Sequence, residues 1–141
     1  MELLIKLNDK QADVIRIALD LWARIGTGDL TSLLHHPEIS RRLVTDKGVT
    51  TEDVRRLLES LSESVFDLPP DTYFGIRSPQ IGEGNRIAFD LMQVFRHRLA
   101  WLRAGEPPKR TPEMASGSYD DPFQTSSEPM ALIRQKPNDP L

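Results

Sequence analysis

Arginine and aromatic side chains recur between residues 73 and 103, and together they could bind a nucleotide. Arg96 and Arg103 stand two helical turns apart, so a helix would place them on one face. Guanidinium groups hold phosphates through paired, charge-assisted hydrogen bonds. Tyr73 and Phe74 offer flat rings on which a base could stack, a contact worth roughly 1–3 kcal/mol per base. The same residues also fit a plainer interpretation, in which the arginines form a solvated basic face and the rings fill a core.

A glycine-containing loop precedes the arginine-bearing helix. Gly82 and Gly84 come just before Asn85, and the free N–H groups at the start of a helix can bind an anion. The alternative is a flexible turn followed by Asn85 as a helix N-cap. The residues themselves leave both interpretations open.

No pattern typical of a catalytic centre is found in the chain. A Gly-x-Ser-x-Gly nucleophile turn and a Gly-x-x-x-x-Gly-Lys-Ser/Thr phosphate loop are both missing. Cysteine is absent, and the adjacent His35 and His36 would point in different directions on a helix, so they cannot share a metal without further ligands. Asp20 and Asp90 fall on predicted polar helix faces. We therefore expect no enzyme activity, no metal and no cofactor, and a protein that works by binding.

The overall charge limits the classes of partner. The chain has 141 residues, a formal net charge of -3 and a pI near 5.6. Non-specific DNA binding relies on Lys and Arg that displace counterions from phosphates, so an acidic chain disfavours it. No apolar stretch is long enough for a membrane span or a signal peptide, which predicts a cytoplasmic protein.

The elements that would position these residues are predicted from periodicity. Residues 2–8 alternate like an edge strand, and residues 72–77 are aromatic and β-prone. Three longer helices are expected, over residues 9–25, from Thr50 or Thr51 to before Pro69, and over residues 85–104, with a short helix before Pro37. The pattern predicts an α+β fold, with a small sheet packed against three to four helices.

Three polar residues are predicted to cap the helices. Asn8 with Gln11 forms the pattern of a capping box. Asp29 is expected to cap the short helix before Pro37, and Thr50 or Thr51 the helix that follows.

The composition divides the chain into two parts. Residues 1–104 are predicted to form a single domain. Residues 105–141 are rich in proline and poor in branched apolar residues, which is typical of a tail. We expect this tail to lie partly extended on the core or on a neighbouring subunit.

Three separated segments, taken together, resemble one family. They are YFGIRSPQIGEGNRIAFDLMQVFRHRLAWLR, which contains the predicted long helix, the opening IRIALDLWARIGTGDLTSLL and the tail piece YDDPFQTSSEP. In this order they are similar to the phage anti-Thoeris sponge proteins, the first type of Thoeris anti-defence protein. That resemblance implies an oligomeric α+β fold built from dimers, a dimer or hexamer of this chain.

The resemblance also implies a function and a set of contacts. Members bind cyclic ADP-ribose isomers made by bacterial immune enzymes, and cyclic trinucleotides at a separate site, without degrading them, in the host cytoplasm. Phe74, or alternatively Tyr73, would stack on adenine, and Asn85 would bind a ribose or phosphate. Phosphates would be held by Arg77, Arg86, Arg96 and Arg103, with Asp121 and Thr125 closing the pocket across a dimer. The segment GEPPKRTPEMASG departs from the family pattern in its length and proline content.

Two other functions remain as alternatives. One is a small phage regulator that binds and inhibits a host protein, for which the acidic surface and the extended tail are the supporting features. The other is a hydrolase of cyclic nucleotides, which would need a histidine or metal constellation.

Overall fold

The computed structural model describes residues 5–43, 48–104 and 119–134, and helices are the only regular secondary structure in these residues. Four α-helices and one 3-10 helix follow in order: α1 (Asp9–Gly26), η1 (Leu30–His35), α2 (Pro37–Leu43), α3 (Thr51–Phe66) and α4 (Glu83–Ala104). No strand occurs in these residues. The predicted α+β fold with a small sheet is therefore wrong.

The two segments predicted as strands show why the sheet is absent. A strand is stable only when a neighbouring strand pairs with its N–H and C=O groups. In residues 72–77, the N–H of Phe74 instead donates to the carbonyl of Thr27, 2.8 Å away, and the N–H of Ser78 closes a turn onto Gly75. Residues 5–8, the described part of the other predicted strand, form no strand either. The rest of that predicted strand, residues 2–4, lies outside the described residues.

The predicted caps are confirmed at three helices. The side chain of Asn8 accepts from the N–H of Gln11, and the Gln11 side chain accepts from the N–H of Asn8, which completes a capping box at α1. Asp29 accepts from the N–H of Ser32 at the start of η1. Of the two threonines proposed for α3, Thr50 is the N-cap.

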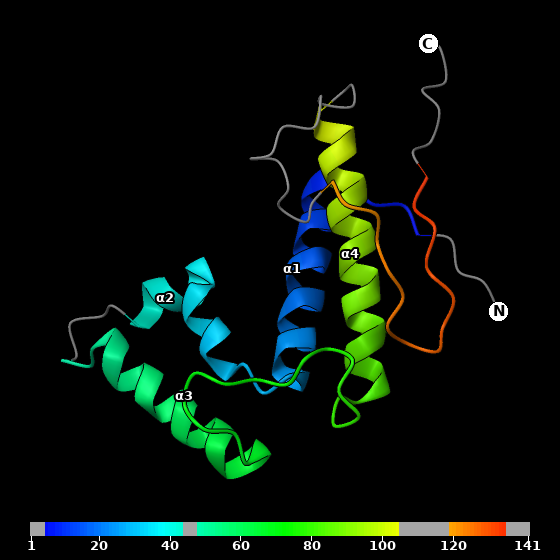
Figure 1. Cartoon of the computed structure of the whole chain (residues 1–141). Coiled ribbons are helices and arrows are strands. Elements are labelled where there is room, and N and C mark those ends of the chain that lie inside the picture. The colour runs from blue at the N-terminus through cyan, green and yellow to red at the C-terminus, as the bar shows by residue number, and fades with distance from the viewer. Residues whose placement is uncertain (1–4, 44–47, 105–118, 135–141) are drawn as a thin grey trace.

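The core of the molecule is an antiparallel pair formed by α1 and α4 (Figure 1). The buried apolar residues of the pair are Ala12 and Ala23 on α1 and Ala88, Met92, Val94 and Leu99 on α4. At one end of the pair, Asn85 Nδ2 donates to the carbonyl of Trp22 at 2.7 Å. Gly26 permits this approach, because a Cβ at position 26 would lie 2.5 Å from Asn85 Cβ.

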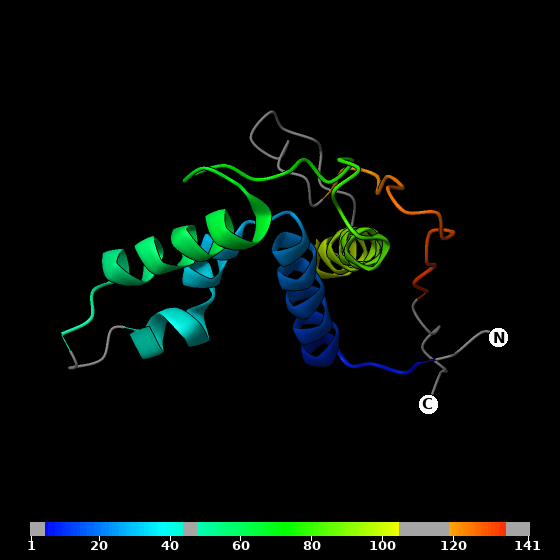
Figure 2. The same ribbon diagram turned by 90° about the horizontal axis from the view of Figure 1, so that it is seen from below.

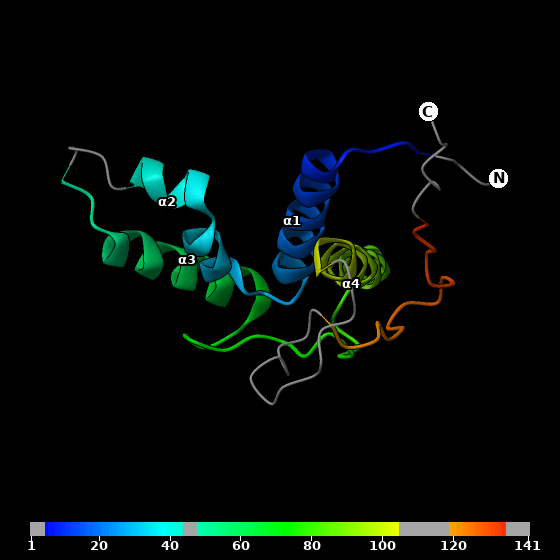
Figure 3. The ribbon, with the colours of Figure 1, turned by 90° about the horizontal axis from the view of Figure 1, so that it is seen from above.

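η1, α2 and α3 form an arm beside the α1–α4 pair, as the two rotated views show (Figures 2 and 3). Ser62 of α3 ties this arm to the end of α1, because its hydroxyl donates to the carbonyl of Gly28 at 2.8 Å. A row of apolar side chains on α3 is only partly covered. Leu57, Leu61 and Val65 are 68%, 49% and 61% exposed.

The described part of the tail, residues 119–134, has no helix or strand and runs along α4 (Figure 1). The ring of Tyr119, at the start of this segment, packs edge-on against the ring of Trp101 near the end of α4, with centroids 5.4 Å apart. Within the described ranges, no helix combines the length and apolar character that crossing a bilayer requires.

Candidate functional site

Three arginines converge on a cleft between α1 and α4, which we call the arginine cleft. Arg16 of α1 faces Arg96 and Arg103 of α4 across a cavity of about 260 Å³, whose floor is formed by Leu99 and Ala100. Antiparallel pairing produces this arrangement, because it brings the first half of α1 beside the last turns of α4, where Arg103 contacts Asp9 and Asp13. The prediction that Arg96 and Arg103 share a face is consistent with this placement.

The three guanidinium groups differ in how they are paired. Arg103 contacts Asp9 at 3.1 Å and Asp13 at 3.0 Å, and Arg16 contacts Asp13 at 3.2 Å. Arg96 takes part in none of the ion pairs found among the described residues, and its buried Nε has no hydrogen-bond partner there. Arg96 is therefore the group in the cleft with the most unused capacity to bind an anion.

The charge of the cleft is set by these pairs. The hydrogen bond from Arg103, followed by that from Arg16, holds the pKa of Asp13 below its ordinary value despite partial desolvation. Asp13 is thus a carboxylate at neutral pH and occupies part of the hydrogen-bonding capacity of two arginines. A phosphate that enters the cleft could bind Arg96 directly, but it would have to compete with the Asp13 carboxylate for Arg16 and Arg103.

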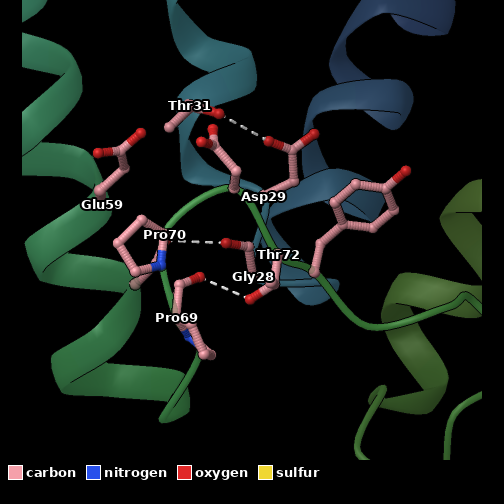
Figure 4. Close-up of a pocket in the computed structure, with 10 residues that line it drawn as sticks. Gly28, Asp29, Thr31, Glu59, Pro69, Pro70 and Thr72 are labelled. Carbon is pink, nitrogen blue, oxygen red and sulfur yellow. Dashed lines mark hydrogen bonds between the residues drawn. The ribbon is translucent and has the colours of Figure 1, made fainter.

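Tyr73 lies in a different pocket, at the junction of α1, η1 and α3 (Figure 4). This pocket has a volume of about 130 Å³, and three carboxylates line it, those of Asp29, Glu59 and Asp71. Asp29 accepts a hydrogen bond from the Thr31 hydroxyl at 3.1 Å, as Figure 4 shows. No arginine is among the residues that line this pocket, although Arg24 contacts Asp29 at 3.4 Å, and the three carboxylates disfavour a phosphate beside Tyr73.

Phe74 and Asn85 both make contacts that hold the fold together. The Phe74 ring is half-buried, and its N–H donates to the Thr27 carbonyl at 2.8 Å. The Asn85 amide is directed at the Trp22 carbonyl. Because α4 begins at Glu83, Asn85 is inside the helix, and its proposed role as N-cap is wrong.

Arg77 and Arg86 lie on the other side of α4, near the tail. The guanidinium of Arg77 lies over the ring of Phe123, 5.3 Å from its centroid. Arg86 Nη2 donates to the Ser78 carbonyl at 2.8 Å. Both guanidinium groups therefore have a partner from the tail or the preceding loop, although the buried Nε of Arg86 has no hydrogen-bond partner among the described residues.

Asp121 is exposed, whereas Thr125 is held firmly against α4. Both the N–H and the hydroxyl of Thr125 donate to Asp90, at 2.9 and 2.7 Å. The N–H and hydroxyl of Ser126 donate to the other oxygen of Asp90, at 2.9 and 2.7 Å. Asp90, predicted on a polar helix face, is instead only 5% exposed beneath the tail.

The predicted site residues thus fall into separate places within one chain. Arg96 and Arg103 come together, but the rings and Asn85 are at the opposite end of the α1–α4 pair. With a rise of about 1.5 Å per residue, Asn85 and Arg103 are about 27 Å apart along α4. A pocket that unites the arginines with a ring would need a second copy of the chain.

Sequence reasoning missed Arg16 and Asp90. Arg16 belongs to the cleft only because α1 and α4 pair in antiparallel, and no local pattern in α1 indicates this. Asp90 could have been found from its spacing, since a carboxylate among Ala88, Met92 and Val94 stands next to the buried face of α4.

In the described part of the chain, no three His, Cys, Asp or Glu side chains gather as a metal site would require. Comparisons of the chain with protein-family models, with curated proteins and with solved structures found no match.

Proposed function

We propose that this chain is a phage immune-evasion protein that sequesters cyclic nucleotide signals, namely cyclic ADP-ribose isomers and cyclic trinucleotides, in the host cytoplasm. The observation that supports the proposal is the arginine cleft, where Arg16, Arg96 and Arg103 surround one cavity. Cyclic nucleotides of both kinds carry phosphates, and guanidinium groups bind phosphates with two parallel hydrogen bonds.

The cleft suits the phosphate part of such a ligand. Its volume of about 260 Å³ is small for a complete cyclic nucleotide, so the bases would lie outside it. We propose that a homo-oligomer, a dimer or hexamer, brings Tyr73 or Phe74 of another copy to these bases. This would account for rings and arginines that are far apart within one chain.

Sequestration, not hydrolysis, fits the chemistry of the cleft. A guanidinium stays protonated at neutral pH and cannot accept a proton, so none of the three arginines can act as a general base. The carboxylate of Asp13 has a lowered pKa because Arg103 and Arg16 bind it, which makes it a weak base. These groups can hold an anion, but they offer no acid–base pair.

Calorimetric titration of the protein with cyclic ADP-ribose isomers and cyclic trinucleotides tests the proposal. A useful sponge needs a Kd near nanomolar, about −12 kcal/mol. Arg96→Gln should weaken binding roughly 10- to 100-fold, because it removes one charge-assisted pair worth about 1.5–3 kcal/mol. The matched control is Arg56→Gln, which removes an exposed arginine on α3.

The fate of the ligand separates binding from catalysis. After incubation and heat denaturation of the complex, a sponge returns the ligand chemically unchanged. Equal affinities for the wild type and Arg96→Gln would refute the role of the cleft. Recovery of a linear product would refute sequestration.

A second candidate function is the inhibition of a host protein, and the exposed row on α3 favours it. Leu57, Leu61 and Val65 follow one another at helical spacing and remain largely exposed, which is how a helix presents itself to a partner groove. A purified host protein that binds the wild type saturably but not Leu61→Glu would support this candidate. Equal binding to both would exclude the α3 row.

A further inference from the structure

α4 holds the tail in the way that a peptide-binding domain holds an extended ligand. We call the α4 residues involved, Glu83, Phe89, Asp90 and Gln93, the tail groove. The part of the tail that contacts it, residues 123–127, is the tail segment, with the sequence Phe-Gln-Thr-Ser-Ser. The groove residues and the tail segment are at least 30 positions apart in the chain, the separation of Gln93 and Phe123.

The groove recognises the main chain of the segment at its first residue. Gln93 Nε2 donates to the Phe123 carbonyl at 2.9 Å, and the Phe123 N–H donates back to Gln93 Oε1 at 3.3 Å. One side-chain amide thus satisfies both main-chain groups of a residue, as a neighbouring strand would. Gln93 is only 3% exposed, so the amide is fixed in place.

The groove also selects the side chains at the third, fourth and fifth residues of the segment. Asp90 accepts from the hydroxyls and the N–H groups of Thr125 and Ser126. Glu83 accepts from the Ser127 hydroxyl at 2.6 Å, and from the Ser127 N–H. A carboxylate only accepts hydrogen bonds, so side-chain donors are favoured at these positions, and an acidic or apolar side chain would leave Asp90 with the main-chain N–H groups as its only partners from the segment.

An aromatic anchor completes the pattern. The Phe123 ring packs edge-on against Phe89 with centroids 5.8 Å apart, and the Arg77 guanidinium lies over its other side at 5.3 Å. Such ring and cation–π contacts each contribute about 0.5–1.5 kcal/mol beyond the burial of area. The ring remains 45% exposed, so it can leave without disrupting a core.

We propose that the tail groove is a peptide-recognition site. It binds an extended segment in which an aromatic residue is followed, two and three positions later, by residues with a hydroxyl group. The chain's own tail segment has this pattern and occupies the site in the structure. A segment tethered to its site has an effective concentration in the millimolar range. The tail segment therefore blocks the groove in the resting protein, and a free peptide with the same pattern binds when the segment is released. This inference does not depend on nucleotide binding.

The first test uses the full-length chain with a disabled tail, Phe123→Ala with Ser126→Ala, and a fluorescently labelled peptide of residues 119–131. We expect the peptide to bind this variant with micromolar affinity, and to bind the wild type at least tenfold more weakly. Adding Asp90→Asn to the variant should weaken binding at least tenfold. A peptide with Thr125→Val and Ser126→Ala should not bind, whereas a peptide with Asp121→Ala should bind as the original does.

A second test removes the dependence on a variant that could fold poorly. A protease site introduced within residues 105–118 of the otherwise unchanged chain is cut after folding. The severed tail should remain associated at micromolar protein concentration and be displaced by excess peptide of residues 119–131, as size-exclusion chromatography can measure. Immediate loss of the severed tail, or retention of it against a hundredfold excess of peptide, would overturn the proposal. So would equal peptide affinity for the wild type and the tail-disabled chain.

Discussion

Replacement of Asp90 by asparagine is the most direct probe of how the tail is held. The Thr125 hydroxyl donates to Oδ1, and the Ser126 hydroxyl and N–H donate to Oδ2. The Thr125 N–H is shared between the two oxygens, at 2.9 Å from Oδ1 and 3.1 Å from Oδ2. Asparagine has the same shape and keeps one oxygen, but its NH₂ group cannot accept a hydrogen bond. Asp90→Asn should therefore preserve the Thr125 contacts and break those of Ser126.

The size of the effect follows from the two lost hydrogen bonds. A hydrogen bond to a charged group is worth about 1.5–3 kcal/mol. Because the released segment regains water as a partner, we take the lower value for each bond, about 3 kcal/mol for the pair. The equilibrium for release of the tail should rise roughly 100-fold, while the α1–α4 pair stays folded.

Amide hydrogen exchange measures this directly, because the two reporting N–H groups are themselves bonded to Asp90. In Asp90→Asn, the amides of Thr125 and Ser126 should exchange roughly 100-fold faster, and the amides in the middle of α4 should exchange as before. Gln124→Ala is a matched control, since the hydrogen bonds of that side chain go to Ser126 and Glu128 within the tail. Unchanged exchange in Asp90→Asn would refute the reasoning.

The same carboxylate makes the attachment of the tail dependent on pH. Burial alone raises the pKa of Asp90, but the hydrogen bonds from Ser126 and Thr125 outweigh it and bring the pKa below the ordinary value of 3.8. A lowered pKa in the folded state means that the stabilisation is complete above pH 3.8 and is lost as the pH falls through the folded-state pKa. The protection of the Thr125 and Ser126 amides, relative to their intrinsic exchange rates at each pH, should thus be independent of this group above about pH 5 and should fall below pH 3.8.

Three further changes test the helix pair. Gly26→Ala should lower the free energy of unfolding, measured in urea titrations, by about 1–3 kcal/mol, because the added Cβ would lie 2.5 Å from Asn85 Cβ. The control Gly84→Ala should be neutral or stabilising, because no atom lies within 4 Å of the added Cβ. Equal effects of the two substitutions would exclude the close approach at Gly26. Asn8→Ala should cost about 1 kcal/mol through loss of the capping box of α1, and an unchanged midpoint would contradict that role. Arg103→Ala should lower the melting temperature slightly. The difference in melting temperature between variant and wild type should shrink in 1 M salt, because the partners Asp9 and Asp13 are partly exposed. A difference that does not change with salt would indicate that Arg103 stabilises by packing instead.

Local patterns were sufficient for α1, η1, α3 and α4, but not for α2, which begins at the proline where a helix was expected to end, and not for the strands. The capping residues Asn8, Asp29 and Thr50 were predicted because a cap is made within three or four residues of its own chain. A strand depends on a neighbour that periodicity cannot reveal. The sequence of residues 72–77 suits a strand, but the N–H of Phe74 meets the end of α1 instead.

The candidate site divides in the same way. That Arg96 and Arg103 share a face followed from helical spacing, and so did the expectation of an anion site. Which acids and arginines stand opposite them depended on the antiparallel pairing of α1 with α4. The stacking roles of Tyr73 and Phe74 and the closing roles of Asp121 and Thr125 stay predictions, because they involve a ligand or a second copy.

The amino-acid sequence by itself determined the three longer helices and the caps of α1, η1 and α3, since each depends on backbone preferences and on contacts within one or two turns. The tertiary structure alone decided that no sheet forms in the described residues, that Arg16 joins the arginine cleft, and that Asp90 is buried under Thr125 and Ser126. These outcomes rest on contacts between residues far apart in the chain. The free energy of such contacts depends on which surfaces meet, and no single segment of the sequence contains that information.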